Sequence, residues 1–190
     1  TLGARREMLV GFLAEPALLM VMFSASLISQ STSLTTIVET LAHREFVIYP
    51  GLAFAGVAFV MVALAENARV PVDNPSTHLE LTMIHEALIL EYSGRHLALV
   101  EWAASLKLFA YSCIGLALFC PWGVADADTP MALLLALPVL IFKLAVGGML
   151  LAMIETASAK MRVFRVPEFL GTAFLLAVIG LLVNVLLGVG

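Results

Sequence analysis

Residues 131–154 read MALLLALPVLIFKLAVGGMLLAMI, a run of 24 residues with one charged side chain, Lys143. The hydrocarbon core of a bilayer is about 30 Å thick, and a helix of roughly 20 mainly apolar residues crosses it. The stretch is therefore long and apolar enough to span a membrane. No series of short alternating strands accompanies it, so a helix is the expected form.

The rest of the chain has the same character. Of the 190 residues, 62% are apolar and 13% are charged, and the mean hydropathy is +1.04. Soluble proteins have about 45–50% apolar and about 25% charged residues. A chain of this size cannot bury such an excess in its own core. The composition excludes a soluble enzyme and a disordered chain, and with a formal charge of −4 it also excludes nucleic acid as a partner. Lipid is the expected surroundings.

Five stretches are apolar enough to cross the membrane, within one membrane domain covering residues 1–190. They are residues 8–28, 46–65, 97–120, 131–154 and 169–187. The predicted fold is an all-α polytopic transmembrane helix bundle. The segments between the spans are interpreted as connections, including Ser29–Glu45, and both chain ends resemble cuts in a longer protein.

The basic residues predict the orientation in the membrane. Lys and Arg gather on the cytoplasmic side of membrane proteins. Seven lie on the side that holds the N-terminus and the connection 66–96, and one, Arg44, lies on the other side. The N-terminus and the 66–96 loop are therefore expected in the cytoplasm. The seven are Arg5, Arg6, Arg69, Arg95, Lys160, Arg162 and Arg165.

Some charged residues lie within or at the ends of the spans, where charge is costly and commonly has a function. A chain of such groups suits a proton or charge relay, although structural pairing between helices, or solvation at span ends, predicts the same residues. Glu101 and Lys107 are six apart, on different helix faces, so they are not expected to pair. The candidate relay residues are Glu15, Glu101, Lys107, Lys143 and Glu155.

The loop 66–96 begins Glu-Asn-Ala-Arg-Val-Pro-Val-Asp-Asn-Pro. Pro71 and Pro75 bracket Asp73 and favour a rigid extended turn. Glu66 and Arg69, three apart at a helix end, could pair. After Pro75, a capping box predicts a short polar helix over Leu79–Leu90. The loop lacks an H-E-x-x-H motif, and Cys113 and Cys120 do not form a C-x-x-C pair, so no metal site or iron–sulfur cluster is expected in this chain.

These loop residues carry a resemblance to a known family. The pattern Glu66-x-x-Arg69-x-Pro71-x-Asp73-x-Pro75, then Glu80-Leu81 and Glu91-Tyr92-Ser93-Gly94, resembles respiratory complex I subunit 1. That family includes membrane subunits of energy-converting [NiFe] hydrogenases. The chain is most similar to the branch of hydrogenase-4 component C and formate hydrogenlyase subunit 4, because the loop departs from the Glu-rich pattern of complex I. It would correspond to the last five of about eight family helices.

The resemblance implies a non-catalytic coupling subunit in a prokaryotic cytoplasmic (inner) membrane. The loop would dock hydrophilic hydrogenase-like or dehydrogenase-like subunits, which carry iron–sulfur clusters and, in hydrogenases, a [NiFe] site. Charge would pass to antiporter-like membrane subunits and move protons or sodium ions. The coupling-loop residues would be Glu66, Arg69, Asp73, Glu80, His85, Glu86 and Glu91. A quinone-binding complex I subunit and a stand-alone ion transporter are the alternatives; the departures in the loop argue against quinone.

Overall fold

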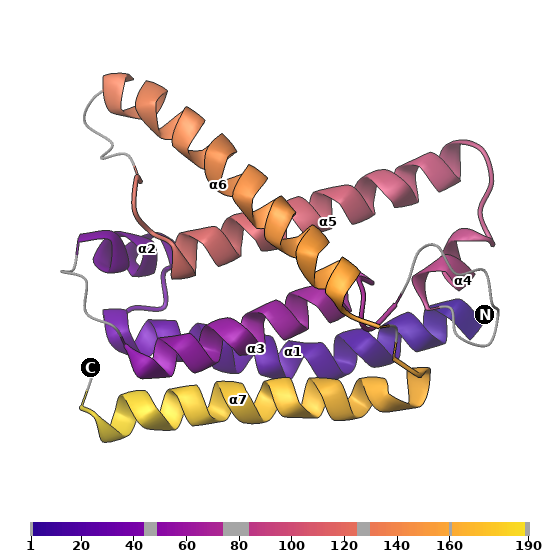
Figure 1. Ribbon diagram of the computed structural model, residues 1–190, viewed down its shortest axis with the longest axis horizontal. Coiled ribbons are helices and arrows are strands. Elements are labelled where there is room, and N and C mark those ends of the chain that lie inside the picture. The colour runs from indigo at the N-terminus through magenta and orange to yellow at the C-terminus, as the bar shows by residue number, and fades with distance from the viewer. Residues whose placement is uncertain (1, 44–48, 74–83, 125–129, 160, 189–190) are drawn as a thin grey trace.

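The computed structural model describes residues 2–43, 49–73, 84–124, 130–159 and 161–188. Four of its helices are long and apolar enough to cross a membrane, namely Gly3–Ser29, Arg95–Phe119, Leu134–Ala157 and Val166–Leu186. The all-α polytopic bundle predicted from the sequence is confirmed (Figure 1). The elements in chain order are α1 (Leu2–Ser29), α2 (Leu34–His43), α3 (Pro50–Glu66), α4 (His85–Ile89), α5 (Arg95–Phe119), α6 (Pro130–Ala157), the 3-10 helix η1 (Val163–Arg165) and α7 (Val166–Leu186).

The span expected at residues 46–65 corresponds to α3, an apolar helix of 17 residues. Its first residue is Pro50, and proline is favoured there because the first amides of a helix need no partner within it. At 1.5 Å per residue α3 is about 25 Å long, slightly less than the hydrocarbon core. Residues 44–48 lie outside the described part of the chain.

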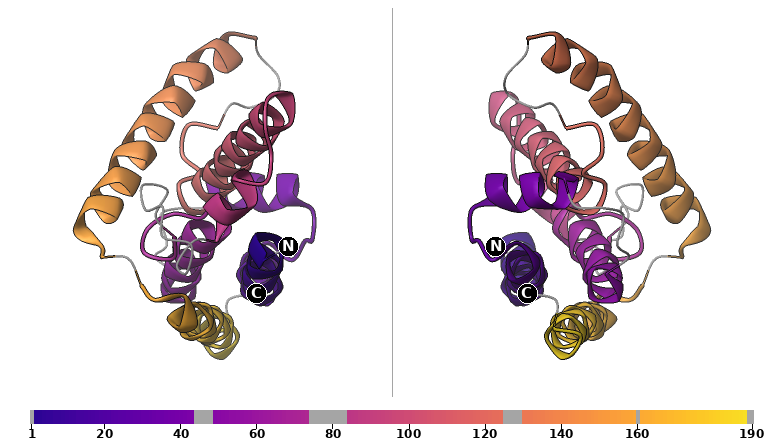
Figure 2. Two further views of the ribbon diagram at one scale, coloured as in Figure 1. Left: turned by 90° about the vertical axis from the view of Figure 1, so that its right-hand side faces the viewer. Right: turned by 90° about the vertical axis from the view of Figure 1, so that its left-hand side faces the viewer.

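Helices α1, α3 and α7 lie side by side and form the core (Figures 1 and 2). Small residues face each other between them. In a membrane the hydrophobic effect does not drive helices together, because lipid tails are as apolar as the side chains. Small side chains let helix backbones approach closely, so van der Waals packing holds the helices together instead. The buried small residues are Ala14, Ala17 and Ala25 in α1, Gly51, Ala55 and Ala58 in α3, and Ala173, Ala177 and Gly180 in α7.

The closest approach of α3 and α7 is at Gly51 and Gly180. A Cβ added to Gly180 would lie 2.6 Å from the carbonyl oxygen of Gly51, and a Cβ on Gly51 would collide with the Gly180 carbonyl and the Asn184 side chain. Only hydrogen atoms fit between the two backbones here. This crossing therefore requires glycine on both helices.

Helices α5 and α6 lie outside this core (Figure 2). Phe59 of α3 holds α5 through ring contacts with Tyr111 and Phe119, at centroid distances of 6.2 and 5.5 Å. Helix α6 leaves large apolar side chains such as Leu135 and Phe142 more than 60% exposed. An apolar surface of this extent needs lipid or another membrane protein to cover it.

The segment Ser29–Glu45, interpreted from sequence as a connection, contains the ten-residue helix α2. Ile37 and Leu41 of α2 are buried and pack with Ile28 of α1 and Leu118 of α5. The search for 20-residue apolar spans could not find a short amphipathic helix of this kind. Of the polar helix expected over Leu79–Leu90, the structure shows α4 over His85–Ile89. The first part of the expected helix falls in residues 74–83, which lie outside the described part of the chain.

Candidate functional site

We call the residues Glu66–Asp73 the junction; the segment begins at the last residue of α3, and α4, α5 and α6 each contact it. We call the end of the bundle where α3 ends, and where α1 and α7 begin, the junction end. Two turns shape the junction, since the Arg69 amide donates to the Leu64 carbonyl at 2.9 Å and the Asp73 amide donates to the Arg69 carbonyl at 3.1 Å. The rigid extended turn expected between Pro71 and Pro75 reaches beyond the described residues, because residues 74–83 are not described; its described part, Arg69–Asp73, is a hydrogen-bonded turn.

Asp73 is the most deeply buried charged residue of the junction, at 1% exposed. Its Oδ2 accepts hydrogen bonds from the backbone amides of Ile84 and His85, at 3.1 and 3.0 Å. These amides lie at the start of α4, where helix amides have no intrahelical partner and a carboxylate is favoured. Asp73 therefore holds the N-terminal end of α4 to the junction.

Glu66 ends α3 and contacts Lys107 of α5, with 2.6 Å between Oε2 and Nζ. The Glu66 side chain is 12% exposed and that of Lys107 39%. A carboxylate so little hydrated needs a counter-charge, and Lys107 supplies it. The pair thus joins α3 to α5 at the junction end.

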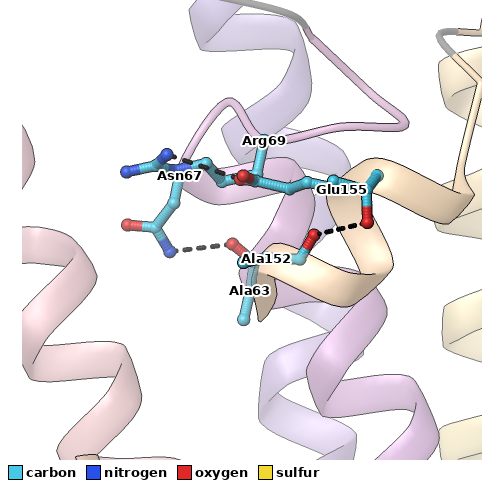
Figure 3. A network of polar contacts seen from close by, with 6 residues as sticks. Ala63, Asn67, Arg69, Ala152 and Glu155 are labelled. Carbon is cyan, nitrogen blue, oxygen red and sulfur yellow. Dashed lines mark hydrogen bonds and ion pairs between the residues drawn. The ribbon is translucent and has the colours of Figure 1, made fainter. Parts of the chain in front are cut away.

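Arg69 contacts Glu155, near the end of α6, with 3.4 Å between Nη1 and Oε1 (Figure 3). A second link lies nearby, because the Met161 amide donates to the Pro71 carbonyl at 2.9 Å. The junction is thereby tied to the end of α6 and to the segment that follows it. The pairing of Glu66 with Arg69, which their spacing allows, does not occur; the two side chains have separate partners.

A cavity of about 250 Å³ lies beside the junction, between α1, α3, α4 and α5. His85 of α4 and Glu7 of α1 meet at its edge, with 3.4 Å between Nδ1 and Oε1. Gly11 also lines it, and a Cβ there would lie 3.6 Å from Oε1 of Glu66. The ionisable residues lining the cavity are Glu7, Glu66, His85 and Lys107. They come from four helices, so charges of both signs surround one small volume.

The candidate relay residues are not all brought together. Lys107 and Glu155 contact the junction, whereas Glu15 and Glu101 are exposed on α1 and α5. Lys143 donates to the carbonyl oxygens of Cys120 and Trp122, just after α5, and lies 4.3 Å from the centre of the Trp122 ring. That is the end of α5 away from the junction (Figure 1). Lys143 thus satisfies helix-end carbonyls, a role for which lysine is suited.

Some of the coupling-loop candidates also lie at the junction and others do not. Asp73, Glu66, Arg69 and His85 meet at the junction, while Glu91 is exposed in the turn after α4. Glu86 lies in α4, but its side chain is outside the described part, as is all of Glu80.

Glu7 is a site residue that was not among the candidates predicted from the sequence. Its position four residues before Gly11 puts both on one face of α1, the face that lines the cavity. Its nearness to the N-terminal end of the helix made it look like an ordinary solvated charge.

The family model described as "NADH dehydrogenase" matches residues 1–186. The chain belongs to the NADH dehydrogenase family. This family member is 32% identical to formate hydrogenlyase subunit 4 of Escherichia coli (strain K12) over 173 residues, which are 91% of this chain and 55% of the relative. It is 31% identical over 176 residues to hydrogenase-4 component C of the same organism, covering 92% of this chain and 54% of the relative.

The family and the helices agree on the class of protein. The family is that of complex I subunit 1, and four helices of the described residues are long and apolar enough to cross a membrane, so this family member is an integral membrane protein. The names of the two relatives denote a subunit and a component of larger assemblies. The resemblance inferred from the loop residues is confirmed. The chain spans about half the length of these two relatives.

Proposed function

We propose that this chain is the coupling subunit of a complex I-like, group 4 hydrogenase-type complex in a prokaryotic cytoplasmic membrane. The junction end would face the cytoplasm and a hydrophilic arm. That arm would carry the iron–sulfur clusters and the [NiFe] or other redox site, and this chain would carry no cofactor. Antiporter-like subunits would receive the signal in the membrane and move protons or sodium ions.

The observation that carries the proposal is the convergence of two ion pairs and a helix cap on the junction. Within eight residues, Glu66 contacts α5, Arg69 contacts α6 and Asp73 holds α4. A change of charge or position at α4 would therefore act on two membrane helices at once. Coupling between distant sites requires an element that both sites bias, and the junction has the contacts for this.

The cavity gives the junction groups that can exchange protons. Two carboxylates, a lysine and a histidine lie on a volume of about 250 Å³, and the other lining residues are apolar or glycine. Carboxylates, lysine and histidine are side chains that commonly accept and donate protons. The cavity therefore supports a proton-linked role of the junction.

The test is Arg69→Gln in the intact complex, with Arg95→Gln as the matched control, because Arg95 is exposed at the start of α5. Redox turnover is measured with a soluble dye, and ion movement is measured in sealed vesicles. We expect R69Q to keep dye-linked turnover and to lower the number of ions moved per electron by about fivefold or more. R95Q should leave both unchanged.

Unchanged ion movement in R69Q would show that the junction is only a scaffold. Ion exchange by the purified chain alone would instead support a stand-alone transporter. Protection of the cavity from chemical labelling by a quinone-site inhibitor would favour the quinone-binding alternative.

A further inference from the structure

The turn between α6 and α7 exposes an aromatic ring between two arginines. Phe164, in η1, is 91% exposed, the highest value among the exposed large apolar side chains of the described residues. Arg162 and Arg165 on either side of it are also exposed. Neither arginine takes part in an ion pair with another described residue.

The structure holds this turn in place. The Arg165 amide donates to the Arg162 carbonyl at 2.8 Å, and the Met161 amide donates to the Pro71 carbonyl at 2.9 Å. Directly after the turn, Val166 is 2% exposed and packs in the core with Val10 of α1. Because both ends of the turn are fixed, Phe164 cannot reach the core without breaking these contacts. The fold itself therefore keeps the Phe164 ring exposed.

The length of α7 indicates the depth of the turn in the membrane. Helix α7 has 21 residues, which is about 31 Å of helix and close to the thickness of the hydrocarbon core, and Glu168 is in its first turn. Arg162 to Arg165 come immediately before this helix, so we expect them among the lipid headgroups at the junction end. At that depth an aromatic ring can enter the acyl region while long basic side chains reach the phosphates.

The described charged side chains at the turn carry a net positive charge. Arg162 and Arg165 stand against one exposed carboxylate, Glu168 in the first turn of α7, while Glu155 is engaged by Arg69. Arginine binds phosphate oxygens through two parallel hydrogen bonds, which makes it a strong ligand for phosphate groups.

We propose that the turn Met161–Val166 is a binding site for an anionic phospholipid of the surrounding membrane. Arg162 and Arg165 bind the phosphate, and the Phe164 ring lies against the glycerol and upper acyl chain. Because the Met161 amide is bonded to Pro71, a bound lipid also steadies the junction. The proposal rests on the depth and charge of the turn and does not depend on ion coupling.

The experiment is photo-crosslinking in the intact complex, with the photoreactive residue p-benzoylphenylalanine in place of Phe164. The complex is reconstituted in phosphatidylcholine vesicles that contain a minority of phosphatidylglycerol, and adducts are identified by mass spectrometry. The matched control places the same residue at Leu135, which is exposed on α6 and distant from the turn.

We expect the Phe164 site to yield mainly phosphatidylglycerol adducts, and the Leu135 site to yield lipids in the bulk proportion. Arg162→Gln and Arg165→Gln should each lower the enrichment at Phe164 about fivefold, the factor equivalent to about 1 kcal/mol for one basic residue at an anionic surface. Arg5→Gln should leave the enrichment within about twofold of the original, because this arginine lies on α1. Adducts to another subunit would overturn the proposal and assign the turn to an acidic protein partner. Adducts in the bulk lipid proportion would overturn it as well.

Discussion

Lys107 of α5 lies 2.6 Å from Glu66, the last residue of α3, and provides the counter-charge for a carboxylate that is only 12% exposed. Lys107→Gln should therefore leave that carboxylate unpaired in poorly hydrated surroundings. We expect a loss of about 1–2 kcal/mol in the free energy of unfolding, below the 3–5 kcal/mol of fully buried pairs because Lys107 is 39% exposed.

A double-mutant cycle with Glu66→Gln in detergent micelles measures this pair. The double variant should be more stable than K107Q alone, since no unpaired charge then remains. Additive losses in the two single variants would show that the pair contributes nothing.

The Gly51–Gly180 crossing predicts that Gly180→Ala weakens the core. The new Cβ would lie 2.6 Å from the Gly51 carbonyl oxygen, so α3 and α7 must separate. We expect a loss of about 1–3 kcal/mol in thermal or denaturant unfolding. The control is Gly171→Ala in the same helix, where nothing lies within 4 Å; alanine there should be neutral or slightly stabilising. Equal effects of the two variants would contradict the close approach.

Asp73 should stabilise the N-terminal end of α4. Asp73→Ala removes the acceptor for the Ile84 and His85 amides, whereas Asp73→Asn keeps a carbonyl oxygen that can accept the same bonds. Loss of a helix cap costs about 1 kcal/mol, which corresponds to roughly fivefold faster amide hydrogen exchange. We expect this increase at Ile84 and His85 in D73A, with much less change in D73N. Unchanged exchange in D73A would mean that Asp73 does not hold α4.

Lys143 is expected to stabilise the fold and to take no part in coupling. It is 8% exposed and its ammonium group donates to two carbonyl oxygens at the end of α5. Lys143→Met should lower the free energy of unfolding by about 1–3 kcal/mol, the cost of losing hydrogen bonds made by a charged group. The surviving complex should keep its ratio of ions moved per electron. A lost ratio at unchanged stability would instead place Lys143 in the relay suggested by its position in a span.

The sequence was most informative where one physical rule acts alone. Apolar length predicted the four long spans, and the loop pattern predicted the family. It could not predict α2, whose ten residues depend on burying Ile37 and Leu41 against neighbouring helices. The pairs of the site also escaped it, because Arg69 and Glu155 are 86 positions apart and meet only through the arrangement of α3 and α6.

Charged residues in spans illustrate the same limit. Lys107 and Lys143 look alike in the sequence, each a lysine among apolar residues. The fold brings one to a carboxylate and the other to helix-end carbonyls. Which role a buried charge has depends on the neighbour supplied by another helix, and local sequence does not contain that information.

Exchanging the charges of Arg69 and Glu155 in the intact complex tests most directly whether the junction links the arm to the membrane helices. Each side chain is about 30% exposed, so the pair should contribute less than about 1 kcal/mol to stability, and its effect should appear in coupling. Ions moved per electron are measured in vesicles for Arg69→Glu, Glu155→Arg and the double variant. Both single variants should lose coupling, and the double variant should recover most of it. Equal coupling in all three variants and the unmodified complex would contradict the claim that the junction links the arm to the membrane helices.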